Sequence, residues 1–360
     1  MKKIIISILF VILIFNSLDI DELSAYECLV EGDITGDDRL DARDFLVLKD
    51  WLLTGDNNAC DICNADLNND GEVNVLDLSG MKRIFFSEKE PLLFDTPDTL
   101  PYNKSSALYC VDDKSVLYSY NINDKIAPAS LTKLLTASVA LHYMDSNKVI
   151  TVGSEQNLVK SGSSLCLVRP GHRMKLYDLL TGMLMNSGND AAYAVAVSTA
   201  RSVFPEKNLN DSQAVEHFSF LMNDYAESIG IKSSHFTTPE GWDDDAQYTT
   251  VRDLLLLSRH ALSIPEIRSI IGTVQKRVVI ESGEIFNWSN TNRLLDPNST
   301  FYNKNAIGMK TGTTNNAGCC LIGAFEVNDK TYISIVVGCN SNNDRYSIVS
   351  ELISKVNFER

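Results

Sequence analysis

The sequence predicts two modules, an α+β domain built around one antiparallel sheet and, before it, a small all-α module. Apolar strand-like runs lie near both ends of the larger part, with helical patterns between them. This arrangement is typical of a sheet that is assembled from both chain ends and covered by a helical cluster. The smaller part is strongly acidic and repeats one 12-residue pattern. With 360 residues, the chain is longer than one ordinary domain requires.

The first residues have the composition of a secretory signal. The pair Lys2-Lys3 precedes an apolar run over residues 4–15, and Leu23-Ser24-Ala25 offers small residues for cleavage. We therefore expect residues 1–25 to be a signal peptide and the mature chain to be secreted or held at the cell surface. The apolar run is shorter than the roughly 20 residues that span a bilayer. An uncleaved N-terminal anchor is the alternative.

Negative charge is concentrated between residues 26 and 90. This segment holds 16 acidic and 6 basic side chains, in a chain whose net charge is −15. The balance argues against a nucleic-acid-binding surface, which needs clustered Lys and Arg. Dense carboxylates in a short segment indicate binding of hard cations instead. A disordered acidic segment is the alternative interpretation.

Two copies of an oxygen-rich loop occupy this segment, at residues 33–44 and 66–77. Side chains at loop positions 1, 3, 5, 9 and 12, with the backbone carbonyl at position 7, can surround one Ca²⁺. The second copy has Gly71 at position 6, where a sharp turn is needed, whereas the first has Asp38 there and Thr35 at position 3. The predicted ligands of the two calcium ions are Asp33, Thr35, Asp37, Arg39, Asp41 and Asp44 in the first loop, and Asp66, Asn68, Asp70, Glu72, Asn74 and Asp77 in the second.

A helical pattern follows each loop, over residues 45–53 and 78–86, and both loops end in Asp where an EF-hand has Glu. One loop and one helix, repeated twice, resembles a dockerin, the module that plugs an enzyme into a cohesin on a scaffold protein. The resemblance covers about residues 31–88 and implies a cohesin partner and two structural calcium ions. In dockerins the partner is read largely at loop positions 10 and 11. These are Ala42-Arg43 and Val75-Leu76, so the two copies differ.

The segment between the modules has three prolines in eleven residues, from Pro91 to Pro101, which predicts a semi-extended linker over residues 91–104. The larger domain then takes residues 105–360. Two β-hairpins are expected near its ends, the second around Asn328-Asp329. The expected strands are 107–111, 115–120, 319–327 and 331–339, and the expected helices are 131–143, 176–184, 190–200 and 214–229.

Three short motifs in the larger domain predict an acyl-transfer site. They are Ser130-Leu131-Thr132-Lys133, Ser187-Gly188-Asn189 and Lys310-Thr311-Gly312, in that order. A serine hydroxyl is a weak nucleophile at neutral pH, and in S-x-x-K one helical turn places a lysine base beside it. Burial and the positive charge of Lys310 would both favour the neutral form of Lys133, which the base must have.

Each motif residue has an expected role. Ser130 attacks a carbonyl and forms an acyl-enzyme, while Lys133 takes its proton. Ser187 relays a proton to the leaving amine, and Asn189 holds substrate amide groups. Lys310 and Thr311 suit a carboxylate, and Gly312 lets a substrate backbone approach. The N–H groups of Ser130 and Thr313 are candidates for an oxyanion hole.

The sequence around the motifs narrows the choice of protein family. Pro128–Lys133, Leu184–Ala192, His235-Phe236, Asn290–Asn292 and Gly308–Gly312 closely resemble serine-type D-Ala-D-Ala carboxypeptidases, the low-molecular-mass penicillin-binding proteins. The resemblance runs from about residue 105 to residue 340 and implies the penicillin-binding/β-lactamase-like transpeptidase fold. It also implies removal of the terminal D-alanine from peptidoglycan stem peptides, acylation by β-lactams, and no cofactor for catalysis.

Other functions use the same motifs. A serine β-lactamase adds a glutamate that activates the deacylating water, and Glu206–Asn210 matches an E-x-x-L-N pattern; we interpret it as the polar entry to the helix at residue 214. A domain that only binds cell-wall peptide is a second alternative, which intact Ser130 and Lys133 disfavour. Endopeptidase and transpeptidase side activities share the acyl-enzyme.

The cysteines allow several pairings. Cys28 could meet Cys60 or Cys63, and Cys319 or Cys320 is expected opposite Cys339, either bonded or as a free thiol. Cys110 and Cys166 are expected to be core residues.

Overall fold

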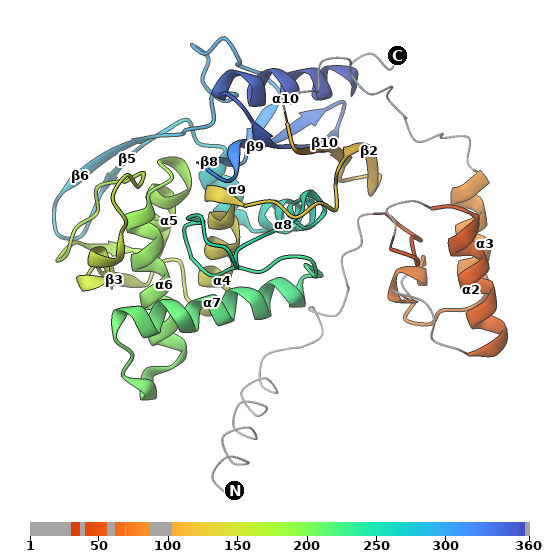
Figure 1. Ribbon diagram of the computed structural model, residues 1–360, viewed down its shortest axis with the longest axis horizontal. Helices are drawn as coiled ribbons and strands as arrows, with labels where there is room; N and C mark the ends of the chain where they lie inside the picture. Colours follow the sequence, from red (N-terminus) through yellow and green to blue (C-terminus); the bar gives the residue numbers. More distant parts are fainter. Residues whose placement is uncertain (1–29, 37–39, 56–61, 69, 87–102, 357–360) are drawn as a thin grey trace, which may run out of the picture.

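A computed structural model describes residues 30–36, 40–55, 62–68, 70–86 and 103–356 (Figure 1). The predicted signal peptide and residues 91–102 of the predicted linker lie outside the described residues, as do loop residues Asp37 and Arg39. Within the described parts, no helix combines the length and the apolar character needed to cross a membrane.

One antiparallel sheet of six strands is formed from both ends of the larger domain, as predicted. The strand order is β2-β1-β10-β9-β7, and β8 also pairs with β9. The first and last strands of the domain are therefore neighbours. The strands are β1 (Ser105–Cys110), β2 (Ser115–Tyr120), β7 (Ala306–Gly308), β8 (Thr311–Thr314), β9 (Gly318–Val327) and β10 (Lys330–Cys339).

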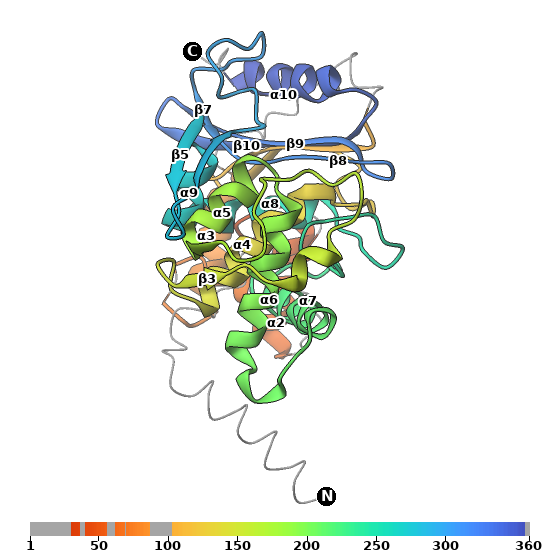
Figure 2. The ribbon, with the colours of Figure 1, turned by 90° about the vertical axis from the view of Figure 1, so that its left-hand side faces the viewer.

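Helices cover both faces of this sheet. Figure 2 shows α10 on one side, and α4, α5 and α8 with the rest of the helical cluster on the other. Two buried apolar clusters fill the two layers between sheet and helices. The helices are α4 (Lys133–Tyr143), α5 (Leu176–Met185), α6 (Asn189–Val203), α7 (Asp211–Ser228), α8 (Val251–Ser263), α9 (Pro265–Ile271) and α10 (Asn342–Val356).

The central strands β1, β9 and β10 are apolar over most of their length because both of their faces are buried. Along β1, Ala107 and Tyr109 join the cluster under the helices, while Leu108 and Cys110 join the cluster beneath α10. Successive side chains of a strand point to opposite faces, so the continuous apolar run in the sequence serves both layers.

The turn between β9 and β10 confirms the second predicted hairpin. Asn328 and Asp329 both have positive φ, 51° and 61°, and Val327 pairs directly with Lys330. Two central residues with positive φ define the type I′ turn, whose twist matches that of the flanking strands. The register then places Cys319 opposite Cys339, and both are free thiols, like Cys110, Cys166 and Cys320.

Several elements are absent from the sequence-based prediction. These are helices α8 and α9, strand β7 and two small two-stranded sheets. The small sheets have strands of only three to five residues, which leave little periodicity to recognise. Their strands are β3 (Val149–Thr151) with β4 (Arg173–Lys175), and β5 (Gln275–Val279) with β6 (Ile285–Ser289).

The small module packs two helices, α2 (Ala42–Thr54) and α3 (Val75–Phe86), around a core of four buried side chains, Ile34, Leu48, Ala65 and Met81. Both helices begin three residues earlier than predicted. Asp41 caps α2, and its backbone N–H donates to the Asp44 side chain in a capping box, so the last loop positions already belong to the helix.

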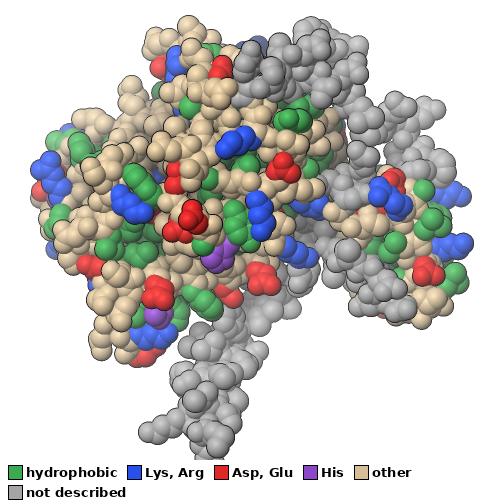
Figure 3. Space-filling model, in the orientation of Figure 1, with side chains coloured by type: hydrophobic (Ala, Val, Ile, Leu, Met, Phe, Trp, Pro, Cys, Tyr) green, Lys and Arg blue, Asp and Glu red, His purple; other side chains and the backbone are tan. Residues whose placement is uncertain are grey.

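On the face of the molecule shown in Figure 3, acidic and basic side chains are interspersed.

Candidate active site and calcium loops

The predicted nucleophile lies on a tightly packed turn. Ser130 is half-buried in a 3₁₀ turn (Ala129–Thr132) that leads directly into α4. The backbone of two glycines comes very close to this turn. A Cβ on Gly241, whose φ is +85°, would lie 1.7 Å from the carbonyl oxygen of Ala129, and one on Gly312 would lie 3.2 Å from the Ser130 nitrogen. Position 241 therefore requires glycine, and a side chain at position 312 would press against the nucleophile turn.

Lys133 is fully buried and its Nζ has three oxygen neighbours. These are Ser130 Oγ at 2.9 Å, Asn189 Oδ1 at 2.8 Å and the backbone oxygen of Glu240 at 2.9 Å. An ammonium group donates to all three. A neutral amine donates only two hydrogens, and only the Ser130 hydroxyl among the three can itself donate. Loss of one proton thus leaves the Lys133 lone pair facing Ser130, which is the geometry of a general base.

Burial lowers the pKa of Lys133 to about 8, because the buried site disfavours the charged form. The nearby carboxyl groups of Glu240 and Asp190 act in the opposite direction. A substantial fraction of Lys133 is therefore neutral at mildly alkaline pH, which is the form that can activate Ser130.

The second and third motifs also meet. Lys310 Nζ donates to Ser187 Oγ at 3.1 Å and to the Thr311 carbonyl at 2.8 Å, and the Lys310 side chain is buried. Ser187 occupies the turn between α5 and α6 with φ of 57°. Burial, with the positive charges of Lys133 and Arg345, holds the pKa of Lys310 well below its usual value.

Asn189 is fixed at the start of α6. Its Nδ2 donates to Ser163 Oγ at 3.0 Å, and its backbone N–H donates to the Ser164 carbonyl at 2.8 Å. These contacts orient Oδ1 toward Lys133. The next residue, Asp190, accepts hydrogen bonds from the backbone N–H groups of Cys166 and Val168, which ties the start of α6 to the preceding loop.

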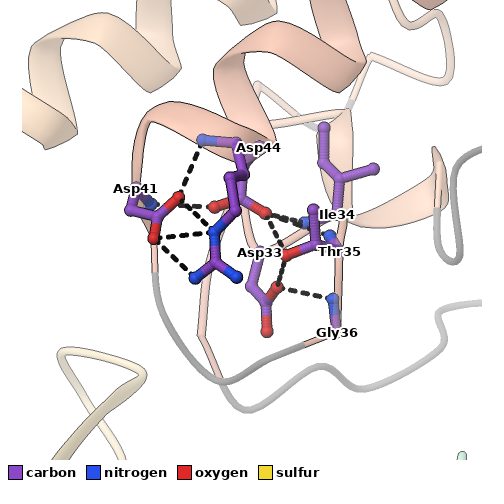
Figure 4. A network of polar contacts seen from close by, with 7 residues as sticks. Asp33, Ile34, Thr35, Gly36, Asp41 and Asp44 are labelled. Carbon is purple, nitrogen blue, oxygen red and sulfur yellow. Dashed lines mark hydrogen bonds and ion pairs between the residues drawn. The ribbon is translucent and has the colours of Figure 1, made fainter.

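In the first acidic loop, the carboxylates are already engaged in a local network (Figure 4). Asp44 Oδ1 accepts from the backbone N–H groups of Ile34 and Thr35 and from the Thr35 hydroxyl. Asp33 accepts from the Gly36 N–H and the Thr35 hydroxyl. The Arg43 guanidinium pairs with Asp41 at 2.7 Å. The carboxylate and hydroxyl oxygens suit Ca²⁺, but Asp41 has a competing cation beside it.

The second acidic loop shares the fold of the first without that ion pair. Asp77 accepts from the backbone N–H groups of Leu67 and Asn74, as Asp44 does in the first loop. Asp66 accepts from the N–H groups of Asp70 and Gly71. Among the described residues no three carboxylate, imidazole or thiol side chains converge on one point, so a calcium site here would also draw on amide and backbone oxygens. The donor set fits Ca²⁺.

Comparison with known families places both modules. The peptidase S11 family, described as D-alanyl-D-alanine carboxypeptidase, matches residues 101–341, about two thirds of the chain. The chain belongs to this family. A dockerin type I domain matches residues 31–85 and precedes the carboxypeptidase domain. Both predicted family resemblances are confirmed.

Curated relatives cover the same region. The D-alanyl-D-alanine carboxypeptidase DacF of Bacillus subtilis is 28% identical over 253 residues, which are 69% of this chain and 61% of DacF. DacC of Escherichia coli is 32% identical over 253 residues, which are 66% of this chain and 57% of DacC. The chain thus spans about three fifths of the length of these relatives.

Solved structures confirm the fold of the carboxypeptidase domain. The DD-transpeptidase of Streptomyces K15 superposes with a TM-score of 0.65 and 26% identity, covering 72% of this chain and 98% of that enzyme. The carboxypeptidase DacD of Francisella tularensis superposes with a TM-score of 0.61 and 24% identity, covering 74% of this chain and 72% of DacD.

Two residues of the carboxypeptidase domain escaped the sequence analysis. Arg345 of α10 is buried and its Nη1 donates to the carbonyl oxygens of Gly312 and Cys320 at 3.0 Å and to the Thr313 hydroxyl at 3.2 Å, so it ties β8 to β9. Glu240 provides the third oxygen neighbour of Lys133. Neither Arg345 nor Glu240 belongs to one of the three motifs.

Glu206 lies far from the three motifs. It is exposed on the short turn Pro205–Lys207 that follows the C-terminal end of α6, while Asn189 begins the same helix. A 15-residue helix is about 22 Å long. Asn210 just beyond it caps α7, in agreement with the interpretation of this segment as a helix entry.

Proposed function

We propose that this protein is a serine D-Ala-D-Ala carboxypeptidase that removes the terminal D-alanine from peptidoglycan stem peptides through a Ser130 acyl-enzyme. The proposal rests above all on one contact, the 2.9 Å hydrogen bond between the buried Lys133 Nζ and Ser130 Oγ. A lysine with a pKa of about 8 is a suitable base for a serine nucleophile near neutral pH.

The reaction has two steps. Neutral Lys133 takes the Ser130 hydroxyl proton while Ser130 Oγ attacks the carbonyl carbon of the penultimate D-alanine. The tetrahedral oxyanion is stabilised by the N–H groups of Ser130 and Thr313, and the peptide C–N bond then breaks. Ser187, which accepts from Lys310 at 3.1 Å, relays a proton to the leaving D-alanine amine and receives in return the proton that Lys133 took from Ser130, so that Lys133 becomes neutral again. Water hydrolyses the ester in the second step and frees Ser130.

The substrate carboxylate would bind at Lys310 and Thr311. Thr311 shares a 2.7 Å hydroxyl contact with Thr291, which holds its side chain in one orientation. Lys133 and Lys310 lie in one buried site, so their side chains repel each other when both are protonated. An anionic substrate terminus offsets that positive charge. β-lactams carry a carboxylate in a similar position and are expected to acylate Ser130.

The dockerin would attach the enzyme to a cohesin on a scaffold protein, outside the cell. Calcium bound by Asp66, Asn68, Asp70, Glu72 and Asn74 would supply the charge that holds these oxygens together, with Asp77 closing the loop. A second calcium ion would be bound in the first loop by Asp33, Thr35, Asp37, Arg39, Asp41 and Asp44.

The decisive experiment uses the purified chain and a pentapeptide muropeptide. Mass spectrometry should show loss of one alanine with the wild-type protein and none with Ser130→Ala. Release of alanine by Ser130→Ala would refute the mechanism. An added amine acceptor, followed in the same spectra, separates hydrolysis from transpeptidation. A long-lived penicillin adduct supports the carboxypeptidase, whereas rapid penicillin hydrolysis would indicate a β-lactamase.

A further inference from the structure

The segment that carries Glu240 contacts both the nucleophile turn and the first turn of α4. The Thr136 hydroxyl donates to the Pro239 carbonyl at 2.6 Å, and Lys133 Nζ donates to the Glu240 carbonyl at 2.9 Å. Gly241 then passes so close to Ala129 that no Cβ fits. Any shift of this segment would therefore move the base as well.

The Glu240 side chain is buried with unusually few donors. Only 2% of the residue is exposed, and Oε1 accepts one hydrogen bond, from the Tyr193 hydroxyl at 3.1 Å. Oε2 is buried and accepts no hydrogen bond from any described residue. A buried carboxylate with one donor is costly unless opposite charge lies nearby. Lys133 and Lys160 supply that charge.

The other acid near Lys133 is in a different situation. Asp190 accepts hydrogen bonds from the backbone N–H groups of Cys166, Val168 and Ala191. Those three N–H groups compensate much of the negative charge of the Asp190 carboxylate. Glu240 lacks them, so Lys133 is its main source of compensation. The groups that face Lys133 are thus Glu240, Asp190, the Cys166 thiol and Lys310.

We propose that Glu240 is a positioning residue for the Ser130–Lys133 pair, whose backbone carbonyl orients the lysine and whose carboxylate acts as its counter-charge. The inference rests on the proposed function, because it needs Lys133 to act as the base. The carboxylate stabilises the ammonium form of Lys133 and so delays the appearance of the active amine as pH rises.

The test is the pH profile of acylation. The second-order rate constant for acylation by a fluorescent penicillin is measured for wild type and Glu240→Gln across the pH range that brackets the pKa of Lys133, about 8. Acylation of wild type rises as Lys133 loses its proton. Removing the negative charge favours the neutral amine, so the rising limb of Glu240→Gln should move to lower pH by about one unit. An unmoved limb would overturn the inference.

Three further variants separate charge from structure. Glu240→Asp keeps the charge and should keep its limb near the wild-type position. Tyr193→Phe removes the side-chain donor to the carboxylate without disturbing the backbone contact. The less compensated carboxylate then favours the Lys133 ammonium more strongly, so the limb should shift slightly to higher pH, opposite to Glu240→Gln. Glu155→Gln alters another buried glutamate, one that accepts from the Gly153 N–H, and should not shift it.

The limb position does not depend on how much protein is folded, so partial misfolding of a variant cannot imitate the effect. The outcomes also separate the two proposals. If wild type is acylated and Ser130→Ala is not, the proposed function stands and the Glu240→Gln limb alone decides the inference. If wild type is not acylated, both fall.

Discussion

The catalytic centre and the acidic loops both consist of polar side chains, but they are held in different ways. Lys133 and Lys310 are buried within a large apolar core and have fixed oxygen partners. The loop carboxylates lie beside a core of four buried residues and are held mainly by the N–H groups of their own loop. The catalytic geometry is therefore built by folding, whereas we expect the loops to gain further stability from a bound ion.

Replacing the base should have the largest effect. Lys133→Met keeps an unbranched side chain in the buried site but removes the amine, so acylation of Ser130 by penicillin should fall about 100- to 10,000-fold. Stopped-flow labelling measures the rate, and thermal unfolding checks that the domain still folds. Unchanged acylation would show that another group is the base.

Calcium removal should affect only the small module. Chelation should unfold residues 31–88 and weaken cohesin binding about 100-fold or more, while penicillin labelling of Ser130 stays intact. Limited proteolysis reports the unfolding, and restored calcium is the control. Loss of labelling on chelation would contradict the independence of the two modules.

A single carboxylate in the first loop should sharpen the comparison between the two repeats. Thr35→Asp adds a charged oxygen ligand at position 3, so calcium binding at this loop should tighten about tenfold. Isothermal titration of the variant against wild type measures the change, with Asn68→Asp as the matched change in the second loop. Weaker binding by Thr35→Asp would mean that the hydroxyl bridge between Asp33 and Asp44 is essential to the loop.

The smallest expected effect concerns the turn after β9. Asp329 has φ of 61°, and glycine adopts this conformation with less strain, so Asp329→Gly should stabilise the carboxypeptidase domain by about 0.5–1 kcal/mol. Calorimetry should show a higher Tm for that domain and no change for the dockerin. A lower Tm would indicate that the Asp329 side chain contributes to the turn.

Local patterns predicted much of the molecule. The Ser130–Lys133 contact spans one helical turn, and the β9–β10 hairpin follows from its two turn residues, so neighbouring residues contain the information. The helix starts were wrong by three residues in the small module because Asp41 serves both as a loop residue and as a helix cap. Four consecutive leucines in α8 fit a buried strand as well as a buried helix when taken alone, which explains why that helix was missed.

Long-range contacts could not be predicted in the same way. Glu240 contacts Lys133 across 107 residues, and Arg345 contacts Gly312 across 33. Neither pairing produces a recognisable motif or periodic pattern in the sequence. Their positions follow from the way in which distant segments pack together, whereas sequence patterns predict each segment only by itself. The catalytic motifs were recognisable because their residue types are chemically restricted, while the residues that support them are not.

The pairing of β1 with β10 also governs when the enzyme can become active during synthesis. Ser105 lies opposite Val337, so β1 cannot pair with β10 until almost the whole chain has been synthesised. Arg345, which binds the backbone of β8, is made later still. A nascent chain that ends before residue 345 carries Ser130 and Lys133 but lacks the strand support around them. Premature termination near the C-terminus should therefore yield protein that no penicillin labels, even though every motif residue has been translated.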